Sequence, residues 1–341
     1  MMTLQKIAEL AGVSKSTVSR VINNDPNVKE NTRERVQAII DAQQYQSNPA
    51  ARALASRHTK ILGVVIPNNI GILFDRSFYF PTILRGISQA ARDRDYAMLL
   101  MLGDDSEDDL RFARRIVHNQ IMDGLALISP SLNHPIIDEL ISAKTTFVSA
   151  DRIPRADVAI NFVTVENVES SKKAVNHLIG LGRRRIAMLA GDTRIIDSLD
   201  RIAGYRLALE SAGIPFEQEL VIETLFEYDD AYSATQQLIT VDKAIDGIYA
   251  GQSTLALAAV NALLDAGRKL PDDISLIAFD DLADAMNPRI GISTMRQPVF
   301  EKGYQITEVL LDLIEEKVTP PVQRYLPAEL VIRDTCGGKA N

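Results

Sequence analysis

The stretch LQKIAELAGVSKSTVSRVIN, residues 4–23, decides how the N-terminal part of this chain folds. Apolar residues recur at helical spacing after Thr3, a good N-cap residue, which predicts an amphipathic helix over residues 4–10. Gly12 permits a tight turn, and Ser14 can cap a second helix whose apolar stripe leaves polar side chains on the opposite face. Two short helices joined by such a turn form a helix-turn-helix, whose second helix enters a DNA major groove.

A third helix is predicted within DPNVKENTRERVQAIIDAQQY, residues 25–45, with Asn31 as its cap and Glu34 completing a capping box. This helix should close a small three-helix core. The next segment, SNPAARALASRHTK, has a helix pattern of about eight residues, too short to be stable alone. We expect it to order only when packed against a partner, such as a second copy of the chain with DNA beneath. The alternative makes Leu54 an ordinary core leucine of a linker helix.

The charge distribution also points to a polyanion. Residues 1–60 carry nine Lys or Arg against five Asp or Glu, a net charge of +4. The totals of 37 basic and 45 acidic residues leave 28 and 40 for residues 61–341, a net charge of −12. A basic module on an acidic body suggests nucleic acid as a partner, although chance variation of the surface is the simpler reading of charge alone.

Length and composition exclude several classes of protein. The chain has 341 residues, enough for two or three domains, and no apolar run reaches the ~18 residues that cross a bilayer. The N-terminus lacks a basic segment followed by an apolar signal core, so we expect a cytoplasmic protein without membrane contact. Cys336 is the single cysteine, and the four histidines show no metal-ligand spacing. We therefore expect no disulfide, no metal and no cofactor.

From Ile61 onward, short apolar runs alternate with helical patterns, as in parallel α/β units. We expect strands at residues 61–66, 96–101, 124–129, 145–150, 185–190, 219–223, 244–250 and 274–279. We expect helices at residues 83–93, 107–119, 167–180, 200–212, 230–239 and 253–266. After residue 293 we expect one strand, a long helix within residues 299–317, and a last strand before the tail. Two similar α/β lobes are the simplest architecture.

Three segments carry a specific resemblance. LQKIAELAGVSKSTVSRVIN, the later NTRERV and the Asn-Pro-Ala-Ala-Arg-x-Leu segment resemble the headpiece and hinge of the lactose-repressor (LacI/GalR) family of bacterial transcription regulators. The resemblance extends over nearly the whole chain. Lys6 departs from the acid usual in the first helix, and Ala55 stands where some members carry a groove-contacting Lys.

The resemblance implies roles for residues of the helix-turn-helix and hinge. Base-reading positions fall on Lys15, Ser16 and Arg20, phosphate-contacting positions on Thr17 and Asn23, and the minor-groove wedge on Leu54. These residue types suit those roles, because Arg can hydrogen-bond guanine bidentately and an apolar wedge can kink a base step.

For the body of the chain the resemblance implies a two-lobed core of the type I periplasmic-binding-protein kind. The chain of such a core passes between its lobes three times, here near residues 161, 292 and 322. The expected fold class is therefore α/β, with a three-helix helix-turn-helix headpiece and a hinge helix ahead of the core. The expected divisions are a headpiece (1–47), a hinge and linker (48–60), a first lobe (61–161 and 293–321), a second lobe (162–292 and 322–335) and a tail (336–341).

Loops that follow strands are the expected effector site, because open α/β sheets bind ligands beyond the carboxyl ends of their strands. Asn68, Phe78 and Phe80 follow the first strand. The resemblance places Asp151, Arg201, Gln252 and Asp280 at positions that commonly face the effector in the family. Charged groups with aromatic walls suit a polyhydroxylated sugar.

Several readings of these residues stay open. Asp280 and Arg201 could instead cap a helix or form an ion pair, and the aromatic residues between 74 and 80 could pack in the core. Gln252 and Ser253 depart from the family's usual Asn-Asp or Asp-Asp pair, which weakens any choice among sugars. The stretches LFDRSFYFPTILRGIS and SLDRIAGY resemble those of maltose-type regulators, which favours an oligosaccharide.

The leading hypothesis is a homodimeric transcriptional regulator, most simply a repressor, that binds double-stranded operator DNA under the control of a small molecule, most simply a sugar. The alternative is a solute-binding receptor, which would need a signal peptide in place of the basic headpiece. An enzyme is not expected: a hydrolase nucleophile elbow at Ser253 lacks its second glycine, and no histidine follows it. No catalytic residue is therefore assigned.

Overall fold

The computed structural model describes residues 3–22, 25–43, 58–66, 78–103, 121–281 and 290–337, together with residues 111, 114 and 117. The chain divides into two compact units. One, the headpiece unit, comprises residues 1–61 with 121–123, and the other, the core, comprises residues 62–120 with 124–341. Within the described residues, no helix is both long and apolar enough to cross a membrane.

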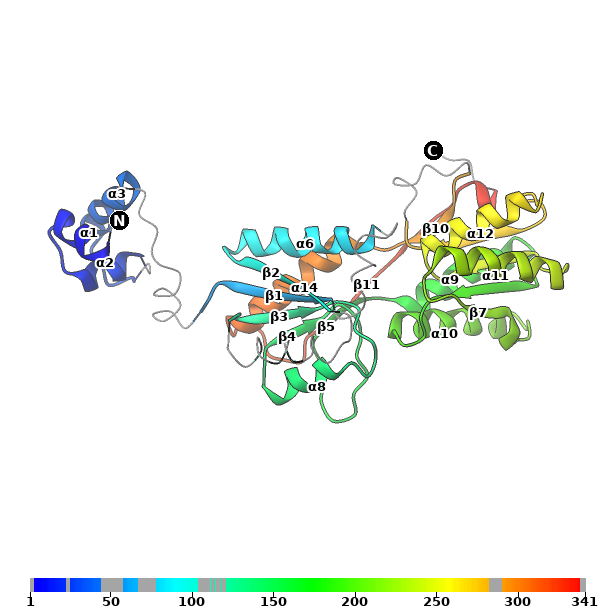
Figure 1. Cartoon of the computed structure of the whole chain (residues 1–341), viewed down its shortest axis with the longest axis horizontal. Coiled ribbons are helices and arrows are strands. Elements are labelled where there is room, and N and C mark those ends of the chain that lie inside the picture. The colour runs from blue at the N-terminus through cyan, green and yellow to red at the C-terminus, as the bar shows by residue number, and fades with distance from the viewer. Residues whose placement is uncertain are drawn as a thin grey trace. The chain divides into compact units, whose positions relative to one another are not determined.

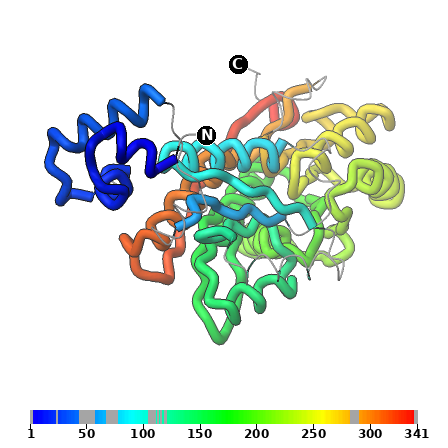
Figure 2. The backbone as a smooth tube through the Cα atoms, turned by 60° about the vertical axis from the view of Figure 1, so that its left-hand side comes forward, coloured from blue at the N-terminus to red at the C-terminus, as the bar shows by residue number. Residues whose placement is uncertain are grey.

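Three helices form the headpiece: α1 (Leu4–Ala11), α2 (Lys15–Ile22) and α3 (Glu30–Ala42). They are the blue helices in Figure 2. Their inward faces share one apolar cluster, made by Ile7, Ala8, Ala11, Val18, Val21 and Val36. Because α1 and α2 are only eight residues each, this shared core, rather than helix propensity, holds them.

The caps of α1 and α2 are those expected, whereas that of α3 is not. Thr3 Oγ1 accepts a hydrogen bond from the Lys6 N–H (3.3 Å), and Gly12 ends α1 with a left-handed φ of 62°. Ser14 Oγ accepts from the Thr17 N–H (3.1 Å) at the start of α2. The prediction that Asn31 caps α3 with a Glu34 capping box is wrong, because α3 already begins at Glu30 and its cap residue Lys29 makes no side-chain cap bond.

The first lobe of the core is built on a six-stranded sheet with the order β11-β5-β4-β3-β1-β2. Its strands are β1 (Ile61–Ile66), β2 (Ala97–Leu102), β3 (Gly124–Leu127), β4 (Phe147–Ser149), β5 (Phe162–Val165) and β11 (Gln323–Leu326). Helices α6 (Tyr79–Asp93) and α14 (Val299–Ile314) bury their apolar stripes in one cluster with these strands. Figure 1 shows α8 (Pro135–Ser142) on the opposite side of the sheet from α6.

The second lobe has a six-stranded sheet with the order β12-β10-β9-β8-β6-β7. Its strands are β6 (Ile186–Ala190), β7 (Val221–Glu223), β8 (Gly247–Ala250), β9 (Ser275–Phe279), β10 (Ser293–Arg296) and β12 (Glu329–Val331). Successive residues of β8 face opposite sides: Ile248 packs with helices α11 (Tyr228–Val241) and α12 (Ser253–Asp265), and Tyr249 with α9 (Asn167–Gly180) and α10 (Ile196–Ser211). Two short 3-10 helices, η1 (Gln218–Leu220) and η2 (Asp334–Cys336), complete the lobe.

The chain passes between the lobes later than expected at all three places. Strand β5 (162–165) belongs to the first sheet, β10 (293–296) to the second and β11 (323–326) to the first. The boundaries placed near residues 161, 292 and 322 therefore each fall one strand too early. Each of these strands pairs within the sheet it extends, so the chain leaves a lobe only after completing that pairing.

The end of the chain also differs from expectation. One last strand is predicted before the tail, but the structure has two, β11 and β12, which lie in different sheets. Strand β12 pairs antiparallel with β10. Neither β5 nor α8 was predicted. The expected hinge helix, and most of the helix expected at residues 107–119, lie outside the described residues. The other predicted strands and helices are present, with ends that differ by a few residues.

Candidate functional site

The exposed face of α2 carries the side chains expected to read DNA. Lys15, Ser16 and Arg20 are exposed, whereas Val18 and Val21 on the other face are buried. The helix is therefore held by one side and offers cationic and hydroxyl donors on the other. This is the arrangement that a recognition helix needs to lie in a major groove.

Hydroxyl groups at the start of α2 contact one another. Ser14 Oγ lies 2.7 Å from Ser16 Oγ and 2.8 Å from Thr17 Oγ1. Ser14 thus serves both as a helix cap and as a hydrogen-bond partner for one expected base-reading residue and one expected phosphate-contacting residue. Asn23 and Leu54, the other two residues expected to contact DNA, lie outside the described residues.

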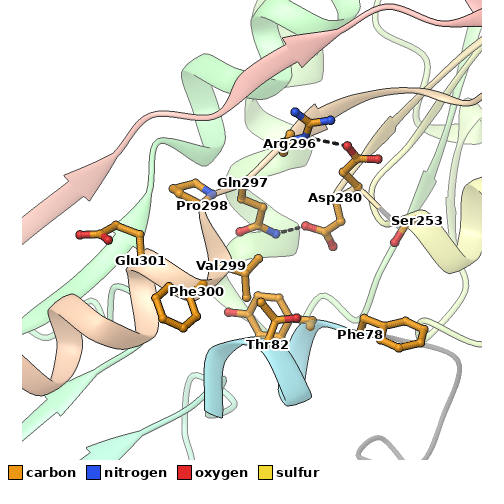
Figure 3. Close-up of a pocket in the computed structure, with 12 residues that line it drawn as sticks. Phe78, Thr82, Ser253, Asp280, Arg296, Gln297, Pro298, Val299, Phe300 and Glu301 are labelled. Atoms are coloured by element: carbon orange, nitrogen blue, oxygen red, sulfur yellow. Dashed lines mark hydrogen bonds and ion pairs between the residues drawn. The ribbon is translucent and has the colours of Figure 1, made fainter. Parts of the chain in front are cut away.

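A cavity of about 410 Å³ lies between the two lobes of the core. Figure 3 shows its lining residues. The first lobe contributes Phe78, Tyr79 and Thr82 from the start of α6, and the second lobe contributes Ser253, Asp280 and Asp281. The segment that leads from β10 into α14 closes the cavity with Arg296, Gln297, Pro298, Val299, Phe300 and Glu301. Its size falls in the range of ~300–1,000 Å³ typical of small-ligand sites.

Asp280 is held in a strained conformation at the edge of this cavity. Its φ is 72°, in the left-handed region that costs a non-glycine residue energy. The Gln297 amide donates to Asp280 Oδ1, and the Thr294 hydroxyl donates to its carbonyl oxygen. Burial raises the pKa of Asp280, against the opposing effect of the Arg201 and Lys302 charges.

Two buried polar atoms at the cavity lack a partner among the described residues. They are Ser253 Oγ and Gln297 Oε1, which belong to residues only 6% exposed. A buried hydroxyl or amide oxygen without a hydrogen bond costs about 1–3 kcal/mol. A ligand with hydroxyl groups would remove this cost at both positions.

Arg201 is buried in the second lobe beside the cavity and is engaged within the protein. Its Nε donates to Asn167 Oδ1 (3.1 Å) and its Nη1 to the Gly251 carbonyl (2.6 Å), while the guanidinium stacks 3.9 Å from the Phe279 ring centroid. The Asp197 carboxylate lies 3.7 Å from Nη2. In the described structure Asn167 Nδ2 and Asp197 Oδ1 have no hydrogen-bond partner.

Asp151 does not line the cavity but forms a buried ion pair in the first lobe. Lys302 Nζ on α14 donates to Asp151 Oδ1 (2.7 Å) and to the Tyr79 hydroxyl (3.1 Å). The Lys302 side chain is 0% exposed and that of Asp151 is 2% exposed. Burial by itself would lower the pKa of Lys302, but the adjacent Asp151 outweighs burial, so the pKa lies above its ordinary value.

The remaining expected effector residues take different places. Phe80, expected to face the effector, is buried in the apolar cluster of the first lobe, whereas its neighbours Phe78 and Tyr79 line the cavity. The Gln252 side chain caps α12 by accepting from the Thr254 N–H (2.8 Å). Asn68 lies outside the described residues.

Sequence reasoning missed Lys302, Asp197, Gln297 and Phe300. One signal was available for Lys302: it lies four residues before Ile306, on the apolar stripe that α14 turns toward the sheet. A charge on such a stripe indicates a buried partner. Among the described residues, no three His, Cys, Asp or Glu side chains gather as a metal-binding group.

Comparison with known proteins identifies the chain. The family model described as "Bacterial regulatory proteins, lacI family" matches residues 3–48, and that of the "Periplasmic binding protein-like domain" matches residues 175–336. The HTH-type transcriptional regulator CelR of Thermobifida fusca is 31% identical over 98% of both chains. The chain belongs to the LacI family. The predicted class, a helix-turn-helix transcription regulator, is thereby confirmed.

Solved structures of LacI-family proteins share the fold. A structure of the CelR–cellobiose complex matches with a TM-score of 0.77 and 29% identity, covering 98% of this chain and 100% of the other. The lac repressor dimer bound to operator and an anti-inducer matches with a TM-score of 0.82 and 24% identity, covering 98% and 99%. The predicted fold class, a helical headpiece followed by a two-lobed α/β core, is confirmed.

Proposed function

We propose that this LacI-family regulator is a homodimeric repressor whose affinity for operator DNA is set by an uncharged sugar bound between the lobes of its core. DNA binding is supported by the exposed face of α2, with its cationic and hydroxyl side chains. Effector binding is supported by the interlobe cavity, where two buried polar atoms lack a partner among the described residues. Because such a repressor acts on chromosomal DNA, its place of action is the cytoplasm.

On DNA, Lys15, Ser16 and Arg20 contact base edges, and Thr17 contacts phosphate together with Asn23. All five lie in or just after α2, which enters the major groove. Leu54 inserts into the central minor groove, where two copies of the hinge meet. Two headpieces of a dimer then read two half-sites, so the operator is approximately palindromic. The lac repressor solved as a dimer on operator supports this arrangement.

The chemistry of the cavity favours an uncharged, polyhydroxylated ligand. Aromatic side chains of Phe78, Tyr79 and Phe300 supply apolar walls for sugar ring faces. Carboxylates outnumber cations on the lining, with Asp280, Asp281 and Glu301 against Arg296. This excess disfavours acidic or phosphorylated sugars. The CelR–cellobiose complex shows that a related protein binds a disaccharide.

The effector acts by changing the populations of two arrangements of the lobes. The three crossing segments allow the lobes to move, and the cavity is lined from both lobes. A sugar that contacts both lobes binds one arrangement more tightly, and only this difference in affinity can shift the equilibrium. The hinge segments then gain or lose the spacing that lets them pack on DNA.

The DNA-binding half is tested with the full chain. A preferred duplex is selected from a randomised pool, and fluorescence anisotropy compares its affinity with that of a scrambled duplex. R20A should lose about 1–3 kcal/mol of discrimination at one base pair. K269A, which removes an exposed charge from the core, is the control and should keep the discrimination. Equal loss of affinity for both duplexes in R20A would contradict base reading by Arg20.

The effector half is tested by calorimetric titration of uncharged mono- and disaccharides, each with its phosphorylated counterpart. S253A should weaken binding of the sugar that binds the wild-type chain. S211A is the control, because the Ser211 hydroxyl is exposed and bonds only the Leu207 carbonyl of its own helix among the described residues. Tighter binding of phosphorylated sugars, or a bound sugar that leaves operator affinity unchanged, would contradict the proposal.

A further inference from the structure

The turn that follows α2 places a carboxylate beside the arginine proposed to read DNA. Asp25 Oδ2 lies 3.8 Å from Arg20 Nε. The Arg20 side chain is 65% exposed and that of Asp25 is 28% exposed, so the pair lies at the surface of the headpiece. Within the described residues, Asp25 is the acidic partner of Arg20.

The Asp25 backbone is fixed by hydrogen bonds from both sides. Its N–H donates to the Arg20 carbonyl (2.9 Å), which ties the turn to the end of α2. Its carbonyl accepts from Arg33 Nη2 (2.6 Å), which ties the same residue to α3. The carboxylate is therefore attached to a backbone position that the headpiece core determines, not to a freely moving loop.

The two oxygens of the Asp25 carboxylate have different partners. Oδ1 accepts from the Asn27 N–H (2.9 Å) and from Asn27 Nδ2 (3.0 Å), which closes the turn. The hydrogen bond from the Asn27 backbone is the main reason why the pKa of Asp25 lies below its ordinary value, so the group is ionised at neutral pH. Oδ2 faces Arg20.

We propose that Asp25 is a positioning residue that holds Arg20 by its Nε and so presents the two terminal nitrogens of the guanidinium to a base. Arginine reads guanine with two parallel donors, and the fork formed by Nη1 and Nη2 is such a pair. No hydrogen bond joins those two nitrogens to another group in the described part of the headpiece. The inference rests on the proposed base-reading role of Arg20.

Positioning matters because an exposed arginine has many rotamers. Binding DNA requires one of them, and the lost freedom weakens the complex. A carboxylate that restricts the side chain before binding reduces that loss for the correct base. The same carboxylate repels the phosphate backbone, so its charge lowers affinity for DNA of any sequence. Asp25 should therefore raise specificity while lowering non-specific affinity.

Asp25 is thus expected to change specificity and non-specific affinity in opposite directions. A residue that only maintains the turn would not do so, which gives a test. D25N keeps an oxygen that accepts from the Asn27 N–H but removes the charge, whereas D25A removes both. In the full chain, anisotropy measures affinity for the preferred duplex, for its single-base variants and for a scrambled duplex. R20A should lose about 5- to 150-fold discrimination at one base pair.

In D25N, the ratio of affinities for the preferred duplex and for the variant at that same base pair should fall at least about threefold. Its affinity for scrambled duplex should stay equal or rise. R20A/D25N should lose no more discrimination than R20A alone, because Asp25 acts through Arg20. D25A should show the same loss of discrimination, with a lower thermal midpoint of the headpiece because the turn is opened.

Three results would overturn the inference. One is a D25N variant with wild-type discrimination in an experiment where R20A loses it. Another is a D25N loss that persists in the R20A background. The third is equal weakening on preferred and scrambled duplex, which would mean that Asp25 only maintains the turn. If R20A itself keeps full discrimination, the base-reading role of Arg20 fails, and that failure is separately visible.

Discussion

The buried pair of Lys302 and Asp151 allows a sharp prediction of stability. K302M replaces a fully buried ammonium by an apolar group of similar length, and leaves Asp151, only 2% exposed, without its cation. The Tyr79 hydroxyl loses the same partner. The variant therefore keeps the packing of α14 and changes mainly the electrostatics of the first lobe.

The expected cost follows from the burial of both groups. Removing one partner of a buried ion pair leaves an uncompensated charge and typically costs about 3–5 kcal/mol. Surface pairs are worth only ~0–1 kcal/mol. Because both side chains are almost wholly buried, we expect K302M to lose about 3–5 kcal/mol of the free energy of unfolding.

A second substitution separates lost attraction from lost volume. D151N/K302M carries no charge at either position, so it should recover at least about 2 kcal/mol of the loss caused by K302M alone. The measurement is urea unfolding of the full, ligand-free chain at pH 7.5, followed by circular dichroism because the chain has no tryptophan. A K302M loss below about 1 kcal/mol, or a double variant less stable than K302M, would refute the argument.

Two further predictions concern the buried Asp197 carboxyl group and the packing of α6. Burial, and then the Asp151 charge, raise the pKa of Asp197 from 3.8 to about 7, so the folded state binds the proton more tightly and stability falls as pH rises through that window. D197N should lack this fall, gaining on the order of 4 kcal/mol relative to wild type between pH 4 and 7.5 in urea unfolding; a constant difference would contradict it. An added Cβ at Gly86 would lie 2.1 Å from the Phe300 carbonyl oxygen, so G86A should cost about 1–3 kcal/mol or more by thermal unfolding. G180A, whose Cβ meets nothing within 4 Å, should be neutral or stabilising, and equal midpoints for the two variants would exclude the clash.

The order of elements was predictable because local signals agree with the tertiary structure. Apolar spacing and caps located α1 and α2, and buried apolar runs located β1, β6, β8 and β9 within a residue or a few. Strand β5 was missed because FVTV is only four residues long, so its identity depends on pairing with β11, more than 150 residues later. The three predicted lobe boundaries fall too early for a related reason. Strand pairing, which the local sequence does not show, decides to which lobe β5, β10 and β11 belong.

The candidate site was less predictable than the fold, because neighbouring residues of one segment take opposite environments. Phe78 and Tyr79 line the cavity while Phe80 is buried in the core, and only the register of α6 decides which is which. Gln252 had an effector-facing position by resemblance, yet its side chain caps α12. The wall from Arg296 to Glu301 begins at the last residue of β10 and continues into α14, and no motif marks it in the sequence.

The placement of β11 has a consequence for synthesis on the ribosome. The first lobe begins at Ile61, but its sheet receives its last strand only when Gln323–Leu326 has been made. Residues 186–296, which supply five of the six strands of the second sheet, are translated before that moment. The lobe that starts first therefore finishes late, and a nascent chain truncated before residue 323 should expose the β5 edge to chaperones and proteases.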